Sequence, residues 1–370
     1  MDDLLRYAAS RGASDIHVKT GDVVRARIDG VLTPISEEPL TADQVRGVAE
    51  RVISDRRVRE SLDNVKEYDC SYGVAGIGRF RVNVLRQRGS LMLVLRIIPV
   101  DIPDFAALRL PPVVEKLSEL ERGMVVVTGV TGSGKSSTQA AMIEAMNRRA
   151  RKHVITLENP IEFLFTDKLS SITQREVGPD TEDFAAGLRS AMRQDPDVLL
   201  IGEMRDAETM DISLKAAETG HLVLSTLHTP DAVSTIHRML AVFPPLEQRS
   251  VRIRLSESVK AVISQRLLPA RSGRGRVLAC EILIMTAAVR DKIAQERPLE
   301  EVRELMEEGT EQYGSQTFDQ HLAKLVNEGL VTYETATAAS TNPADFQLRF
   351  RLDSVAPTDM VSAYMMEQAG

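Results

Sequence analysis

The feature that most constrains the fold is the octapeptide from Gly129 to Ser136, Gly-Val-Thr-Gly-Ser-Gly-Lys-Ser. It matches the pattern G-x-x-x-x-G-K-[ST], a loop whose backbone N–H groups surround phosphate oxygens. An apolar run, Met124–Thr128, precedes it, and a helical pattern follows from Ser137 to Arg149. A glycine-rich turn between a strand and the N-terminus of a helix favours bound phosphate. The sequence therefore predicts a nucleotide site in an α/β domain.

The loop also predicts which groups hold which part of the nucleotide. Lys135 is expected to reach the β- and γ-phosphates of ATP, and the Ser136 hydroxyl to hold Mg²⁺. Kinases, GTPases, helicases and motors all share such a loop, so it does not define the reaction by itself. The residues expected to bind the nucleotide are Gly129, Thr131, Gly132, Ser133, Gly134, Lys135, Ser136 and Ser137.

Short apolar runs alternate with helical patterns beyond residue 104. Besides Met124–Thr128, the runs are Val154–Leu157, Val198–Ile201 and Leu222–Leu227. Strands that are apolar on both faces are typical of a parallel sheet covered by helices. Phe184, Leu188, Ala191 and Met192, and further on Met210, Leu214 and Ala217, have helical spacing. A doubly wound α/β core is therefore expected.

Polar residues end three of these predicted strands, where ligands of open α/β sheets bind. Glu158 follows Val154–Leu157, and a carboxylate there could polarise an attacking water, although it could also cap a turn. Glu203 ends the run that begins at Asp197; this is the Walker B arrangement, which holds Mg²⁺ through a water, and a solvent-facing acid is the alternative. His228 follows Leu222–Leu227 and could sense the γ-phosphate or link one site to the next, with a structural role as the alternative.

The first hundred residues predict a smaller α+β domain. A helix from Asp3 to Arg11, a hairpin turning at Asp29-Gly30 and a helical segment from Ala42 to Ser61 are expected before strands Gly78–Leu85 and Leu91–Ile98. Two strand arginines, Arg81 and Arg96, are candidates for the cation that stabilises transition-state charge, with an exposed sheet edge as the alternative. The expected boundaries are 1–98, a linker at 99–104, an ATPase domain at 105–353 with a helical C-terminal part, and a tail of unclear structure at 354–370.

Composition excludes several other classes. The chain has two cysteines, Cys70 and Cys280, so neither a disulfide framework nor a CxxC metal site is predicted. Neither a signal peptide nor an apolar run long enough to cross a bilayer is evident, and a reducing cytoplasm is expected. The net charge of −7 and the lack of tryptophan argue against nucleic-acid binding. Two basic clusters, at 148–152 and 271–276, are interpreted as a helix end and a surface loop, or as a docking patch for an acidic partner.

Together these residues make the chain resemble the secretion-ATPase superfamily, and within it the type IV pilus retraction ATPases, the PilT/PilU family. The resemblance runs nearly from end to end. The matching segments are Ser14–Val18, Gly78–Asn83 with Gln87–Gly89, Thr128–Ser136, Ile155–Glu162, Gln174–Gly178, Gln194–Asp206, Thr219–Leu222, Thr226–Thr229, Ile263–Pro269 and Gln316–Gln320.

The resemblance implies a PAS-like N-terminal domain, a RecA-like ATPase core and a homohexamer with nucleotide between the two domains. It also implies that Glu158 is catalytic, that the arginines of the N-terminal domain close on the nucleotide, and that the protein works at the inner membrane with a pilus platform protein and possibly a paralogous retraction ATPase. Two departures exist. Asn159 replaces the usual Asp, and Ala288–Gln295 only partly matches a helix typical of retraction enzymes.

Other functions share parts of this pattern. A pilus assembly or type II secretion ATPase of the same superfamily typically carries a four-cysteine zinc insertion, which two cysteines cannot supply. A DNA-translocating protein would need a basic channel with stacking aromatics. A small-molecule kinase would leave the N-terminal domain and His228 unexplained. A structural ring that does not hydrolyse ATP is a further alternative.

Overall fold

The computed structural model describes residues 1–354, which form two compact units. The first comprises Met1–Ile102 together with Asn159–Thr166, and the second comprises Pro103–Glu158 and the chain from Asp167 onward. The segment 159–166 of the first unit lies within 105–353, the range predicted from sequence for the ATPase domain. The predicted tail, 354–370, lies outside the described residues except for Ser354.

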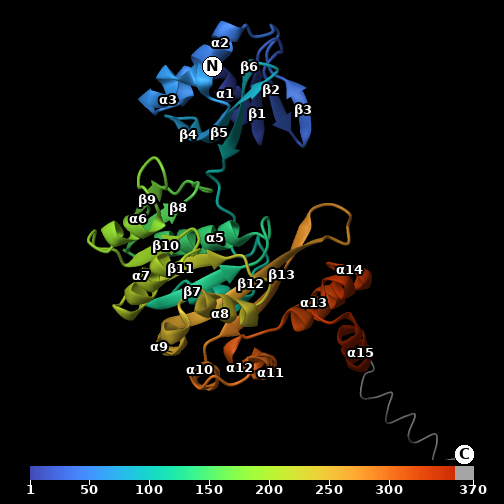
Figure 1. Cartoon of the computed structure of the whole chain (residues 1–370). Coiled ribbons are helices and arrows are strands. Elements are labelled where there is room, and N and C mark those ends of the chain that lie inside the picture. The colour runs from blue at the N-terminus through green and yellow to red at the C-terminus, as the bar shows by residue number, and fades with distance from the viewer. Residues whose placement is uncertain (355–370) are drawn as a thin grey trace, which may run out of the picture. The chain divides into compact units, whose positions relative to one another are not determined.

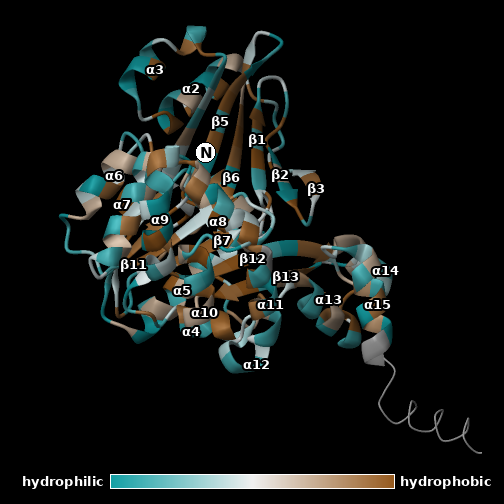
Figure 2. Cartoon of the chain, turned by 60° about the horizontal axis from the view of Figure 1, so that its bottom comes forward, coloured by the Kyte–Doolittle hydropathy of each residue, from teal (hydrophilic) through white to brown (hydrophobic). Residues whose placement is uncertain are grey.

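The first unit is built on a six-stranded antiparallel sheet in the order β3-β2-β1-β6-β5-β4 (Figure 1). Figure 2 shows β6 largely hydrophobic and α3 largely hydrophilic. The strands are β1 (Asp15–Lys19), β2 (Arg25–Ile28), β3 (Val31–Pro34), β4 (Glu67–Val74), β5 (Gly78–Gln87) and β6 (Ser90–Ile98). The helices are α1 (Asp2–Ser10), α2 (Ala42–Val52), α3 (Arg56–Glu60) and the 3₁₀ turn η1 (Leu62–Asn64).

The predicted hairpin at Asp29-Gly30 is confirmed between β2 and β3. The single helix expected from Ala42 to Ser61 is wrong, because the chain breaks after Val52 and begins again at Arg56. Asp55 causes the restart: its side chain accepts hydrogen bonds from the backbone N–H groups of Arg57 and Val58. A carboxylate in that position satisfies N–H groups that have no partner within the new helix.

The second unit is built on a seven-stranded sheet in the order β13-β12-β7-β11-β10-β8-β9. All neighbours are parallel except β13, which is antiparallel to β12. The predicted strands β7, β8, β10 and β11 are confirmed. The strands are β7 (Gly123–Thr128), β8 (His153–Glu158), β9 (Ser171–Glu176), β10 (Val198–Ile201), β11 (Leu222–Leu227), β12 (Val259–Pro269) and β13 (Arg276–Ile284).

Helices cover this sheet and continue beyond it (Figure 1). They are α4 (Pro112–Leu117), α5 (Lys135–Arg149), α6 (Phe184–Ala191), α7 (Ala207–Glu218), α8 (Ala232–Ala241), α9 (Pro245–Ser258), α10 (Ala287–Ala294), α11 (Glu300–Glu308), α12 (Thr310–Tyr313), α13 (Phe318–Asn327), α14 (Tyr333–Ala339) and α15 (Pro343–Ser354). The α/β fold expected from the sequence is therefore confirmed.

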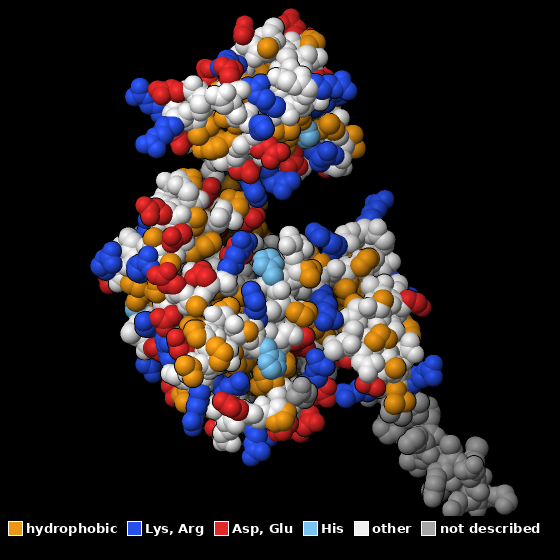
Figure 3. All heavy atoms as spheres, in the orientation of Figure 1, with side chains coloured by type: hydrophobic (Ala, Val, Ile, Leu, Met, Phe, Trp, Pro, Cys, Tyr) orange, Lys and Arg blue, Asp and Glu red, His pale blue; other side chains and the backbone are white. Residues whose placement is uncertain are grey.

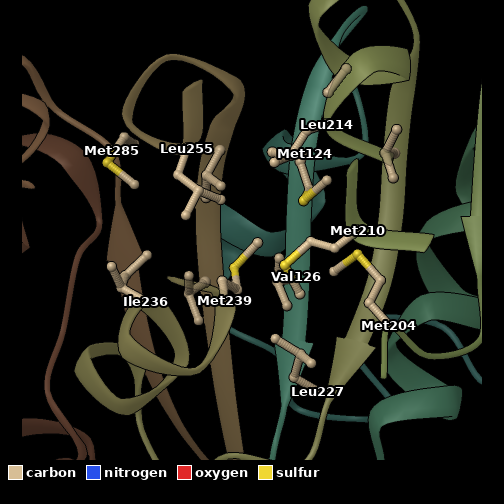
Figure 4. Close-up of a cluster of buried hydrophobic side chains, with 14 of the residues drawn as sticks. Met124, Val126, Met204, Met210, Leu214, Leu227, Ile236, Met239, Leu255 and Met285 are labelled. Atoms are coloured by element: carbon tan, nitrogen blue, oxygen red, sulfur yellow. The ribbon is translucent and has the colours of Figure 1, made fainter. Parts of the chain in front are cut away.

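The main core lies on one face of the second sheet. Side chains of β7 alternate between faces, so Met124 and Val126 enter this core, where Met204, Met210 and Met239 pack with them (Figure 4). Methionine is flexible and fills irregular gaps between branched side chains. A separate small core joins the β12–β13 hairpin to α13, α14 and α15. Because the strands are fixed by burial on both faces, their carboxyl ends form a rigid edge.

Candidate functional site

The phosphate-binding loop runs from the end of β7 to the start of α5, as the sequence predicts. The helix begins at Lys135, two residues earlier than expected, with Gly134 as its N-cap at φ 93°. Gly129 has φ 138°, and a Cβ there would lie 2.5 Å from the backbone oxygen of Gln265. Only glycine fits that position. Thr131 and Gly132 lie in the loop, and Ser136 and Ser137 in the first helical turn.

Lys135 is buried at the base of this loop. Its ammonium donates hydrogen bonds to the carbonyl oxygens of Gly129 and Val130, at 2.8 and 3.1 Å. Burial lowers the pKa of Lys135, and the negative charge of Glu203 opposes that shift. The Ser133 hydroxyl is also buried and has no hydrogen-bond partner within residues 1–354. An ammonium and an unsatisfied hydroxyl inside a glycine loop suit an anionic ligand.

The strand order brings the predicted polar residues to one edge of the sheet. From the loop after β7 the neighbouring strands are β11, β10 and β8, and these end beside His228, Glu203 and Glu158 respectively. His228 Nε2 lies 3.7 Å from Glu203 Oε2. Burial and then the charge of Lys135 lower the pKa of His228, against the opposing effect of Glu203. These effects together favour the neutral form of the histidine.

Glu203 and Glu158 are joined through the backbone between them. The N–H of Gly202 donates to the oxygen of Leu157 at 2.8 Å, and a Cβ on Gly202 would lie 3.5 Å from the Cα of Glu158. The structure thus assembles Lys135, His228, Glu203 and Glu158 in strand order along one edge, which is where an open parallel sheet binds its ligand.

Sequence reasoning missed a cation at this edge. Arg205 Nη2 lies 2.6 Å from Glu203 Oε1, and the arginine side chain is otherwise exposed. Arg205 lies in the segment Gly202–Asp206 that carried the family resemblance, and this resemblance could have identified it as a candidate site residue. It compensates part of the charge of Glu203.

Sequence reasoning also missed Thr156 and Gln174, which both donate hydrogen bonds to Glu158. The Thr156 hydroxyl donates to Glu158 Oε1 at 2.6 Å, and Gln174 Nε2 donates to the same oxygen at 3.2 Å. Glu158 itself is only 8% exposed. The strand alternation of Thr156 and Glu158 would have placed the first donor correctly. Gln174 begins the segment Gln174–Gly178 that carried the family resemblance, although the strand on which it lies, β9, was not predicted.

The expected Mg²⁺ can be tested against the donors present. Ser136 supplies a hydroxyl in the first turn of α5. Glu203 supplies a carboxylate whose negative charge acts to raise the pKa of Lys135. Within residues 1–354 there is no group of three or more His, Cys, Asp or Glu side chains that could enclose a metal. Mg²⁺ beside a nucleotide normally uses one or two protein ligands with phosphate oxygens and waters. The donor set fits a nucleotide-bound Mg²⁺.

Arg81 and Arg96 belong to the first unit, where they lie directly opposite each other on β5 and β6. Both side chains are exposed, and Arg96 Nε lies 2.9 Å from Asp15 Oδ1. The pairing with Asp15 gives Arg96 a structural role of its own. A contribution of either arginine to the nucleotide site stays a prediction.

Two surface properties bear on partners. On the face shown in Figure 3, basic and acidic side chains are interspersed over both units. In the part of the chain that the structure describes, no helix is both long and apolar enough to cross a membrane.

The comparisons with known proteins agree with this geometry. The family model described as type II/IV secretion system protein matches residues 1–338. The chain is 42% identical to the type IV pilus retraction ATPase PilT of Pseudomonas aeruginosa over 93% of its length and 99% of that protein. It is 37% identical to the type IV pilus ATPase PilU of the same organism, over 98% and 94%.

Among solved structures, the pilus retraction motor PilT with bound ADP superposes with a TM-score of 0.84 at 45% identity. The match covers 93% of this chain and 97% of that one. Both the sequence match and the shared fold extend across the two units, including the segment of the glycine loop. The chain belongs to the type II/IV secretion system protein family, as a homologue of the pilus retraction ATPases PilT and PilU.

Proposed function

We propose that this protein is a Mg²⁺-dependent ATPase that converts ATP hydrolysis into mechanical work for retraction of type IV pili. The observation that carries the proposal is the near full-length match to a pilus retraction motor with bound ADP, combined with a complete phosphate loop. Hydrolysis of ATP to ADP and phosphate is the reaction that the site residues fit.

The proposed chemistry divides among five residues, which are Ser136 in the first turn of α5 and the four residues along the sheet edge. Lys135 holds the β- and γ-phosphates, and the loop backbone orients them for attack in line. Ser136 and Glu203 would hold a bound Mg²⁺, which would supply positive charge to the phosphate oxygens. Glu158 orients the attacking water and accepts its proton. His228 hydrogen-bonds near the γ-phosphate and transmits the loss of that phosphate to the loop before α8.

The proposed organisation places a PAS-like domain at 1–98, a linker at 99–104 and the RecA-like ATPase domain at 105–353. The chain passes from the first compact unit to the second between Ile102 and Pro103, which supports a boundary within the proposed linker. Arg81 and Arg96 are proposed to close on nucleotide held between the domains, in a homohexameric ring. Domain rotation upon hydrolysis would then provide the power stroke.

The proposed cellular setting is inferred from the similarity to the pilus ATPases PilT and PilU. The motor would act in the cytoplasm, held at the base of the pilus by an inner-membrane platform protein and without nucleic acid. The similarity to PilU, as well as to PilT, supports a paralogous retraction ATPase as an additional partner.

A pilus assembly or secretion ATPase is the second candidate, because the same family includes secretion proteins. Deletion of the gene in its native host separates the two. Pili that accumulate without retracting, and recover on complementation with the wild-type gene but not with Lys135→Ala, support a retraction motor. Absence of pili would contradict it and favour assembly.

A further inference from the structure

We propose that Thr156 and Gln174 are positioning residues that hold the carboxylate of Glu158 in its working orientation. The inference rests on the catalytic role proposed above for Glu158. It adds two residues to the site, neither of which contacts the nucleotide in the proposed mechanism.

Strand register places the three side chains together. β8 and β9 are parallel, with Thr156 opposite Gln174 and Glu158 opposite Glu176. Side chains two residues apart on a strand share a face, as do register partners on adjacent strands. Thr156, Glu158, Gln174 and Glu176 therefore stand on one face of this strand pair, while Thr173 and Arg175 stand on the other.

Both donors converge on a single oxygen of Glu158. The Thr156 hydroxyl and the Gln174 amide reach Oε1 at 2.6 and 3.2 Å, and Thr156 is fully buried. Two donors approaching one oxygen from adjacent strands fix the plane of the carboxyl group. Rotation of that plane would break at least one bond in a site that water reaches poorly, where an unmade hydrogen bond is costly.

A catalytic base must be ionised and must point at the proton that it accepts, and this arrangement supports both. Hydrogen bonds donated to a carboxylate favour its charged form. A catalytic group displaced by about 1 Å loses on the order of 10²-fold in rate, because reaction depends on near-attack geometry. Removing either donor should therefore lower kcat while leaving the phosphate loop, and so nucleotide affinity, unchanged.

The test uses the full-length protein with steady-state ATP hydrolysis and binding of a fluorescent ADP analogue. Thr156→Val removes the hydroxyl at nearly constant shape, and Thr156→Ser keeps the hydroxyl but removes the methyl group. Gln174→Met removes the amide. We expect kcat to fall about tenfold or more in the Val and Met variants, with ADP affinity within about twofold of wild type and most activity retained in the Ser variant. The acid limb of the kcat profile should shift to higher pH in Thr156→Val.

Thr173→Val is the matched control, because Thr173 lies on the opposite face of β9, where its hydroxyl contacts His153 at 3.0 Å. It should keep wild-type kcat. Wild-type kcat in Thr156→Val and Gln174→Met, with Glu158→Gln inactive, would overturn this inference alone. An active Glu158→Gln enzyme would overturn the proposed catalytic base and this inference with it. If Gln174→Met does not fold, the Thr156→Val and Thr156→Ser pair decides the outcome.

Discussion

The side-chain ammonium of Lys135, the first residue of α5, lies 2.8 Å from the carbonyl oxygen of Gly129, the first residue of the loop before that helix. Lysine and loop backbone therefore form one unit, and a phosphate oxygen is a stronger partner for this ammonium than a neutral carbonyl. The charged group is held in place before any ligand has to organise it.

Lys135→Ala should reduce ATP hydrolysis by at least about 100-fold, because it removes a fixed positive charge from the transferred phosphate. Phosphate release under saturating ATP measures this loss. Lys215→Ala, which removes an exposed lysine paired with Asp211 on α7, is the control and should keep its rate. A normal rate in Lys135→Ala would refute the whole site assignment.

Arg81→Ala should lower turnover by at least about tenfold, since an arginine that stabilises transition-state charge contributes up to about 10³–10⁵ in rate in other NTPases. The side chain is exposed, so the thermal midpoint should hardly move. Arg56→Ala serves as control, because Arg56 pairs only locally with Glu60 on α3. If the rate of Arg81→Ala equals that of wild type, Arg81 is a surface residue.

His321 predicts a specific loss of stability in acid. Burial, and then the charge of Lys324, lowers the pKa of His321 to about 4, and its Nδ1 accepts a hydrogen bond from the Cys280 N–H at 2.8 Å. Between the unfolded pKa of 6.5 and about 4 the unfolded chain binds the extra proton, so the free energy of unfolding falls as pH falls through that window. The loss is on the order of 3 kcal/mol.

His321→Asn keeps an acceptor near the position of Nδ1 but does not titrate. Denaturant unfolding at pH 7, 5.5 and 4.5 should show a smaller decline for this variant than for wild type. Equal declines in the two proteins would mean that His321 is not the group that titrates.

The parts predictable from sequence share a physical cause. Strands β7, β8, β10 and β11 are buried on both faces, so they read as continuous apolar runs, and the phosphate loop is a local pattern of glycine and lysine. The polar residues after those strands could be placed at one edge because parallel strands end together.

The unpredicted parts depend on contacts between distant segments. β9 (Ser171–Glu176) is an edge strand with one apolar residue, Ile172, and so carries no continuous apolar run. β12 contains Ser264 and Gln265, whose side chains bond Thr128 and Thr138 across the sheet and helix. Such pairing satisfies buried polar groups only after folding, so periodicity does not reveal it. Gln174 was missed for the same reason.

The most direct test of the account is ATP turnover by Glu158→Gln beside its nucleotide affinity. The amide keeps the size of the side chain but cannot accept the proton of the attacking water. We predict ATP binding within about threefold of wild type and hydrolysis reduced by about 10²-fold or more. Wild-type turnover would contradict the account, and loss of binding would assign Glu158 a structural role instead.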